Sequence, residues 1–211
     1  MGNNLKRCIF SSSVFLIGLL SVAFAQVQTI KPWTYWWWMG NAVNKNDLKY
    51  ELLNFKKAGI GGVHVIPIYG VKGYEDQFKN FLSPEWIKVY EYTLDEAKKL
   101  GLGVDISTGT GWPFGGPDVT LEMAAKKLVL NGNEFTSAPT LQKVKRAAPG
   151  GEGYVLDPFS SKDMIQYLNR FDSTLMHSQS IRSFIYTTYE VYNANWTNDF
   201  LIEFKTKINQ I

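Results

Sequence analysis

Cysteine is almost absent from the 211 residues: Cys8 is the only one, and it lies in the N-terminal segment. Removal of that segment would leave no thiol, which excludes disulfide scaffolds and thiolate metal sites. Histidine is scarce as well. His64 and His177 stand far apart and show neither the His-Glu-x-x-His spacing nor the facial-triad spacing of a metal centre. No Ser-His-Asp set, dinucleotide fingerprint or Walker phosphate loop is present.

A strong excess of charge of either sign is also lacking. The chain has 22 Lys and Arg against 19 Asp and Glu, a formal net charge of +3, and loss of Lys6 and Arg7 would lower it to +1. A near-neutral surface gives no electrostatic reason to expect nucleic acid as a partner. Aromatic residues, by contrast, make up 15% of the chain and include seven tryptophans. Such rings either fill cores or stack on sugar rings, and composition leaves both roles open.

Residues 1–25 have the pattern of a secretory signal peptide. Two basic residues precede an apolar stretch over residues 9–22, and a small-x-small cleavage pattern ends at Ala25. The apolar stretch is shorter than the roughly 20 residues that span a bilayer. We therefore expect cleavage, no stable membrane anchor, and a secreted or periplasmic bacterial protein, with a retained anchor as the alternative. Residues 26–211 are enough for one ordinary domain.

Four strand-then-helix units can be read along residues 26–211. Short apolar runs predict buried strands over residues 34–39, 62–69, 103–107 and 181–190. Apolar helical stripes follow them, and the predicted helices begin at Asp47, after the capping residue Ser83, after Ser160 or Ser161, and after Thr197. Gly59 and Gly101 are predicted to end the first two helices. The region 131–153 has many turn formers and is predicted to be an excursion from this pattern.

Repeated alternation of strand and helix predicts an α/β fold, a parallel sheet with helices outside. Four units do not close an eight-stranded barrel, and half a barrel leaves two unpaired edges. We therefore predict a partial (β/α)8 barrel of the TIM type, the N-terminal portion of a larger enzyme. An open sheet of four or five strands, complete in itself, is the alternative.

The fourth apolar run stops at Glu190, which Tyr186, Tyr189 and Tyr192 flank. In a barrel of parallel strands, active sites form at the carboxyl ends of the strands, so Glu190 is the candidate catalytic residue and Tyr189 a candidate contact to substrate. Desolvation among these rings would raise the pKa of Glu190, as a general acid near neutral pH requires. A strand-end glutamate paired with a lysine is the alternative.

Other residues at the same end of the predicted sheet are candidates for ligand binding. The loop 107–117 carries Trp112 among four glycines, and it is either a binding loop or a structural turn. Asp105 and Ser107 share one side of the third strand and could bind sugar hydroxyls, although a buried, hydrogen-bonded role is the alternative for Asp105. Asn41 follows the first strand, where its amide could contact hydroxyls or simply lead into the next helix.

Seven segments with a characteristic composition occur in order along the chain. They are Trp36-Trp-Trp-Met-Gly-Asn41, Ala58-Gly-Ile-Gly-Gly-Val63, Leu82-Ser-Pro-Glu-Trp86, Gly109-Thr-Gly-Trp-Pro-Phe-Gly-Gly-Pro117, Arg146-Ala-Ala-Pro-Gly-Gly-Glu-Gly153, Val155-Leu-Asp-Pro-Phe159 and Tyr189-Glu-Val-Tyr-Asn-Ala-Asn-Trp-Thr197. This series resembles the N-terminal barrel region of the glycoside hydrolases of family 106, secreted bacterial α-L-rhamnosidases. The resemblance runs from about Trp33 to the end of the chain.

The resemblance implies removal of terminal α-L-rhamnose from plant-type glycans, with inversion at the anomeric carbon and dependence on calcium. By position Glu190 matches a family catalytic glutamate, which implies the role of general acid. The family usually carries an acidic or amide residue and a serine before the Tyr-Glu pair, where this chain has Thr187 and Thr188.

Family members are several times longer than this chain. Inverting hydrolysis needs a base about 6.5–9.5 Å from the acid, and we expect that base on a later strand, beyond Ile211. The chain alone is then expected to bind sugar poorly and not to hydrolyse it. Two other functions stay open: a secreted, non-catalytic carbohydrate-binding protein, and a barrel glycosidase that acts on another sugar.

Overall fold

The structure is a computed structural model. It describes residues 30–172, 175, 180–186, 188 and 190–208. The predicted signal peptide, residues 1–25, lies outside the described residues. All the helices and strands discussed below lie within residues 31–211. Within the described part of the chain, no helix combines the length and the apolar character needed to cross a membrane.

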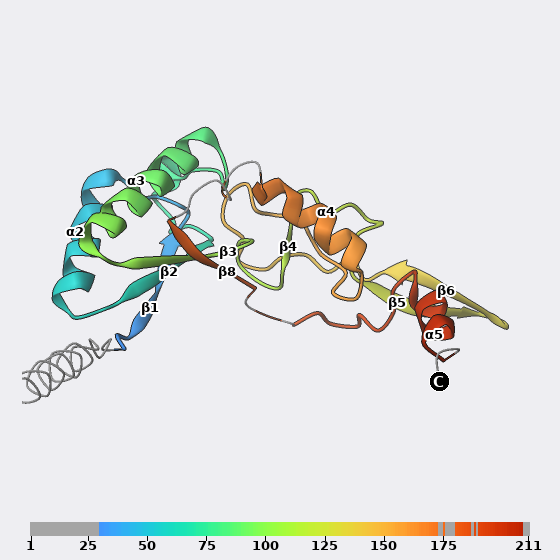
Figure 1. The fold of residues 1–211 in the computed structure, drawn as a ribbon. Helices are drawn as coiled ribbons and strands as arrows, with labels where there is room; N and C mark the ends of the chain where they lie inside the picture. The colour runs from blue at the N-terminus through green and yellow to red at the C-terminus, as the bar shows by residue number, and fades with distance from the viewer. Residues whose placement is uncertain (1–29, 173–174, 176–179, 187, 189, 209–211) are drawn as a thin grey trace, which may run out of the picture. The chain divides into compact units, whose positions relative to one another are not determined.

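Four parallel strands form the main sheet in the order β1, β2, β3, β8 (Figure 1). Their bounds are β1 Trp33–Met39, β2 Gly62–Ile68, β3 Gly103–Ser107 and β8 Ile181–Ile185. The first three strands confirm the predicted ranges to within one residue. The sheet is therefore the parallel α/β arrangement that the alternation of elements predicted.

The prediction that the fourth strand runs to Glu190 is wrong, because β8 ends at Ile185. The last aligned pair of β3 and β8 is Ser107 with Ile185, and the Thr108 N–H still donates to the Ile185 carbonyl at 3.4 Å. Beyond that point β3 turns into the glycine-rich loop. A strand needs a partner for its backbone groups, so the apolar run continues in sequence while the strand does not.

Helices α2 (Lys45–Lys57) and α3 (Pro84–Leu100) lie on one side of the sheet (Figure 1). α2 begins two residues earlier than predicted, because the Asn44 side chain accepts hydrogen bonds from the first-turn N–H groups of Asn46 and Asp47. The Ser83 hydroxyl accepts from the Trp86 N–H at 3.2 Å, as the capping prediction required. Gly101, with φ 65°, ends α3 in the left-handed conformation.

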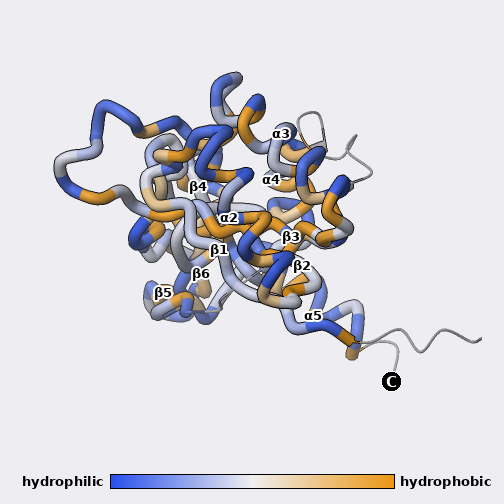
Figure 2. The backbone as a smooth tube through the Cα atoms, turned by 90° about the vertical axis from the view of Figure 1, so that its left-hand side faces the viewer, coloured by the Kyte–Doolittle hydropathy of each residue, from blue (hydrophilic) through white to orange (hydrophobic). Residues whose placement is uncertain are grey.

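The hydrophobic core lies between these two helices and the sheet. Alternate strand residues face the helices, among them Trp38, Val63, Val65, Val104 and Ile106, and all of these are buried. The Trp38 ring centroid lies 5.9 Å from that of Trp86, which α3 supplies. Figure 2 shows hydrophobic stretches near the labels of α2 and β3. Part of the aromatic content is therefore core filling, which was one of the two roles left open by composition.

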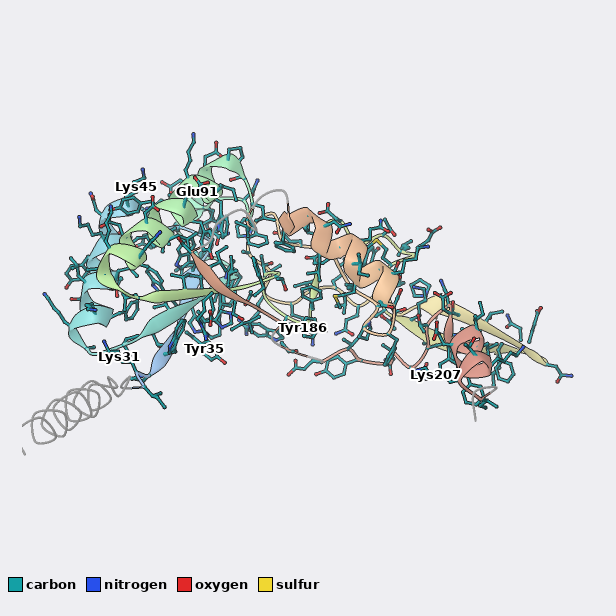
Figure 3. The ribbon with its side chains drawn as sticks, viewed as in Figure 1. Lys31, Tyr35, Lys45, Glu91, Tyr186 and Lys207 are labelled. Carbon is teal, nitrogen blue, oxygen red and sulfur yellow. The ribbon has the colours of Figure 1, made fainter. Side chains whose placement is uncertain are left out.

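The opposite face of the sheet carries aromatic residues that remain exposed. Tyr35 on β1 is 65% exposed, and it lies on the other side of the strands from Lys45 and Glu91 of the helices (Figure 3). The Trp33 indole lies directly against Gly62 and Gly103, and a Cβ atom on either glycine would overlap the ring. Glycine is therefore required at both positions as long as Trp33 occupies this place.

A long insertion separates β3 from β8, and it starts earlier than the predicted excursion at residue 131. It contains β4 (Gly115–Gly116) paired with β7 (Tyr154–Val155), the hairpin β5 (Lys126–Asn131) and β6 (Glu134–Pro139), and helix α4 (Ser161–Asp172). The Ser160 hydroxyl accepts from the Asp163 N–H at 3.3 Å, which identifies Ser160 as the cap of α4. A buried ion pair, Lys126 with Asp157 at 3.6 Å, lies in the same insertion.

The last helix, α5 (Phe200–Ile208), starts three residues after Thr197. The sequence predicts an apolar stripe on this helix, and the structure buries none of the residues of α5. The stripe residues Phe200, Leu201, Phe204 and Ile208 are each 39–51% exposed. The predicted helix is confirmed, but burial of its apolar stripe would need a partner surface that the described residues do not provide.

Candidate active site

A short segment, residues 142–146, joins the carboxyl end of β2 to the glycine-rich loop; we call it the bridging segment. The Lys145 N–H donates to the Trp112 carbonyl at 2.7 Å, and the Trp112 N–H donates back to the Lys145 carbonyl at 3.0 Å. The Tyr69 N–H, directly after β2, donates to the Arg146 carbonyl at 3.0 Å. The bridging segment therefore fixes Trp112 at the end of the sheet where parallel α/β proteins bind their substrates.

The glycine-rich loop serves both of the roles that its sequence left open. Gly111 approaches the bridging segment so closely that a Cβ atom would overlap the Lys145 carbonyl, and its N–H donates to the Pro67 carbonyl at 3.1 Å. Phe114 is buried, with its ring centroid 4.6 Å from that of Tyr186. Trp112 itself is only half-buried. The loop is a packed turn that leaves one indole available at the surface.

Arg146 lies between two aromatic rings at this end of the sheet. Its guanidinium carbon is 4.8 Å from the Tyr69 ring centroid and 5.9 Å from that of Trp112. Its backbone has φ 54°, a left-handed conformation that residues other than glycine rarely adopt. Sequence reasoning missed Arg146 and Tyr69 as site residues. Two signals pointed to them: Arg146 opens one of the seven ordered segments, and Tyr69 directly follows a buried strand.

Glu190 lies in a loop, and the bridging segment holds its backbone. The Gln142 Nε2 group donates to the Glu190 carbonyl at 2.9 Å, while Gln142 Oε1 accepts from the Tyr192 N–H at 2.8 Å. The Lys145 Nζ atom lies 5.0 Å from the centroid of the Tyr192 ring. The Glu190 and Trp112 segments, distant in sequence, are thus attached to the same five residues.

The prediction that aromatic rings desolvate Glu190 is wrong for the described residues, because Glu190 is exposed. Its position in a loop rather than at a strand end explains the difference. The Tyr186 ring packs against Phe114, and the Lys145 ammonium group lies over the Tyr192 ring. Tyr189 lies outside the described residues. The catalytic role of Glu190 is untouched by this correction and stays a prediction.

Asp105 and Ser107 are both buried, and protein groups engage both side chains. Arg182 donates from Nε to Asp105 Oδ1 at 2.9 Å and from Nη2 to Oδ2. The His64 Nε2 atom lies 3.0 Å from the Ser107 hydroxyl. Burial lowers the pKa of His64, and the nearby Asp105 carboxylate only partly opposes this. The geometry favours the buried, hydrogen-bonded role of Asp105; contact of either residue with sugar stays a prediction.

Asn41 is fully buried at a turn with φ 52°. Its Nδ2 group donates to the Lys79 carbonyl at 3.0 Å, while Oδ1 has no hydrogen-bond partner among the described residues. Asn41 therefore shapes the connection between β1 and α2. Its predicted contact with substrate remains untested.

The described residues do not gather a metal-ligand set. Across residues 30–208, apart from the undescribed positions, no three His, Cys, Asp or Glu side chains come together in a way that could hold an ion. The calcium dependence implied by the family resemblance stays a prediction, and no step proposed below uses calcium.

Part of the chain is similar to known proteins. A model of glycoside hydrolase family 106, described as alpha-L-rhamnosidase, matches residues 25–137. A protein of Formosa agariphila named "Putative beta-glucuronidase" is 27% identical over 100 residues, 47% of this chain and 8% of that protein. A solved structure, the rhamnosidase from Novosphingobium sp. PP1Y, aligns with a TM-score of 0.40 and 28% identity over 46% of this chain and 10% of its own. The matched regions thus span about a tenth or less of the length of these relatives.

Proposed function

The chain belongs to the alpha-L-rhamnosidase family of glycoside hydrolases, and from that premise we propose that it is part of an enzyme that hydrolyses terminal α-L-rhamnosyl residues of plant-type glycans with inversion. The family match over residues 25–137, more than half of the chain, carries this proposal. We further propose that the four parallel strands belong to a (β/α)8 barrel. The protein is proposed to be secreted or periplasmic, with residues 1–25 removed as a signal peptide.

Glu190 is the proposed general acid, which protonates the oxygen of the leaving group. In an inverting reaction a second carboxylate then activates water on the opposite face of the sugar, about 6.5–9.5 Å from the acid. We place that base in the remainder of a longer protein, because the matched region is 8% and 10% of the two relatives. Because Glu190 is exposed in the described part of the chain, we propose that bound substrate or further polypeptide covers it during catalysis.

Trp112 and Tyr189 are the proposed contacts to the sugar. Trp112 is half-buried at the carboxyl end of the sheet, where an indole can stack on the apolar face of a pyranose. The polar groups of Asp105 and Ser107 and the amide nitrogen of Asn41 already have partners within the protein. For these three residues we propose that any effect on the sugar acts through the position of the strand ends.

Turnover of an aryl α-L-rhamnoside by the full-length protein tests the proposal. Glu190→Gln is expected to lower kcat by about 10²–10⁴-fold, the range for loss of general acid catalysis, with little change in substrate affinity. Glu203→Gln removes an exposed carboxylate from α5 and serves as the matched control. Normal turnover by Glu190→Gln would rule out the acid role. Binding of rhamnosides without turnover by the unaltered protein would instead support a non-catalytic carbohydrate-binding protein.

A second candidate is a glycosidase of the same family that acts on another sugar. The similarity to the "Putative beta-glucuronidase" favours this alternative. A panel of aryl glycosides that includes α-L-rhamnoside and β-D-glucuronide separates the two. Preference for the glucuronide by the full-length protein would replace rhamnose as the substrate and leave the hydrolase class in place.

A further inference from the structure

The bridging segment carries three cations around the buried side chain of Val144. The Nζ atom of Lys143 is 5.8 Å from the Tyr154 ring centroid, and Lys145 and Arg146 rest on Tyr192, Tyr69 and Trp112 as described above. Among the described residues, none of these three cations forms an ion pair with a carboxylate. A cation that rests on an aromatic ring keeps its hydrogen-bond donors free for an anion.

Lys145 and Arg146 lie closest to the candidate active site. Backbone hydrogen bonds tie Lys145 to Trp112 and Arg146 to Tyr69, so both side chains start from fixed positions. Both residues are exposed, and the left-handed backbone of Arg146 directs a guanidinium between two rings. Gln142 holds Glu190 by its backbone carbonyl, and among the described residues no carboxylate pairs with Lys145 or Arg146, so positive charge prevails at this segment.

We propose that Lys145 and Arg146 bind the carboxylate or sulfate group of an acidic sugar that neighbours the residue to be cleaved. This inference rests on the proposed glycosidase function and deepens it, since it names the substrate class as an acidic glycan. The planar guanidinium of Arg146 can donate two parallel hydrogen bonds to a carboxylate or a sulfate. Lys145 adds a second, adjustable positive charge.

Binding to charged and neutral polysaccharides tests the inference without any need for catalysis. The full-length protein is run through native gels that contain polygalacturonate, dextran sulfate or unmodified dextran. The buffer has an ionic strength of about 0.1 M, at which the Debye length is about 10 Å. We expect retardation by one or both anionic polymers and none by dextran. Polygalacturonate and dextran sulfate distinguish carboxylate recognition from sulfate recognition.

Three variants locate the site. Arg146→Gln and Lys145→Gln are each expected to weaken binding to the anionic polymer about tenfold, as loss of a charge-assisted hydrogen bond implies. Lys45→Gln is the matched control, because Lys45 is also an exposed lysine over a ring, 5.1 Å from the Tyr92 centroid, but on the helix-covered side of the sheet (Figure 3). Circular dichroism melting confirms that all three variants are folded.

Three results would overturn the inference: no retardation by either anionic polymer, an equal loss in Lys45→Gln, or tighter binding to a single-stranded oligonucleotide than to any acidic glycan. Rhamnoside turnover is measured separately on the same samples. Failure of turnover with intact, Arg146-dependent glycan binding would reject the proposed hydrolase and keep the binding site. Normal turnover without binding to the anionic polymers would keep the proposed hydrolase and reject the acidic-sugar site.

Discussion

Replacement of Gln142 by leucine tests whether one side chain holds the Glu190 segment in place. The variant removes two hydrogen bonds, one to the Glu190 carbonyl at 2.9 Å and one from the Tyr192 N–H at 2.8 Å. A net intramolecular hydrogen bond contributes about 0.5–1.5 kcal/mol. Because water competes for both groups at the surface, we expect a total near the lower end, about 1–2 kcal/mol. That corresponds to roughly a five- to thirtyfold change in the local opening equilibrium.

Amide hydrogen exchange at Tyr192 measures this opening directly. In Gln142→Leu the Tyr192 amide is expected to exchange about tenfold faster, and kcat of the full-length protein is expected to fall because Glu190 is less well positioned. Gln142→Glu keeps an oxygen for the Tyr192 N–H but loses the donor to Glu190, so Tyr192 should stay slow. Gln166→Leu, an exposed amide on α4, is the control. Unchanged exchange at Tyr192 in Gln142→Leu would refute the clamp.

Three further outcomes are expected. Lys126→Met leaves the buried Asp157 carboxylate without its ion-pair partner, so the free energy of unfolding measured in urea should fall by about 3–5 kcal/mol. Addition of Asp157→Leu should restore most of that loss. Equal losses in the single and double variants would contradict this expectation. Burial lowers the pKa of His64, so the unfolded chain takes up the proton first, and the free energy of unfolding should be highest above pH of about 6.5 and fall below it. His64→Gln should flatten that dependence, and an unaltered slope would show that another group is responsible. The purified 211-residue chain should release no rhamnose from an aryl α-L-rhamnoside, and detectable release would show that it already contains both catalytic groups.

Elements with local signals were predictable from the sequence. The bounds of α3 follow from the capping hydroxyl of Ser83 and the left-handed Gly101, both of which act within one turn of the helix. The range of β3 was predicted to the residue. Burial of α5 was not predictable, because an apolar stripe shows which side of a helix would face a partner but not whether a partner is present.

The candidate site was only half visible in the sequence. Trp112 and Glu190 stood out by their glycine-rich and aromatic neighbours. Gln142 gave no signal, and Arg146 was marked only as the first residue of an ordered segment, because their roles arise from the pairing of the bridging segment with two segments that are distant in the chain. The predicted end of β8 was wrong for the same reason, because the length of a strand depends on the backbone hydrogen-bond partners that the neighbouring strand provides.

The contact of Trp33 with Gly62 and Gly103 has a consequence for the history of the family. Three strands meet at this one indole, so neither glycine can gain a methyl group while the tryptophan stays. Homologous sequences should therefore vary at these three positions together: a smaller residue at 33 would permit alanine or serine at 62 and 103. An aligned set of relatives in which bulky residues occupy all three positions would show that the sheet can meet this constraint in another way.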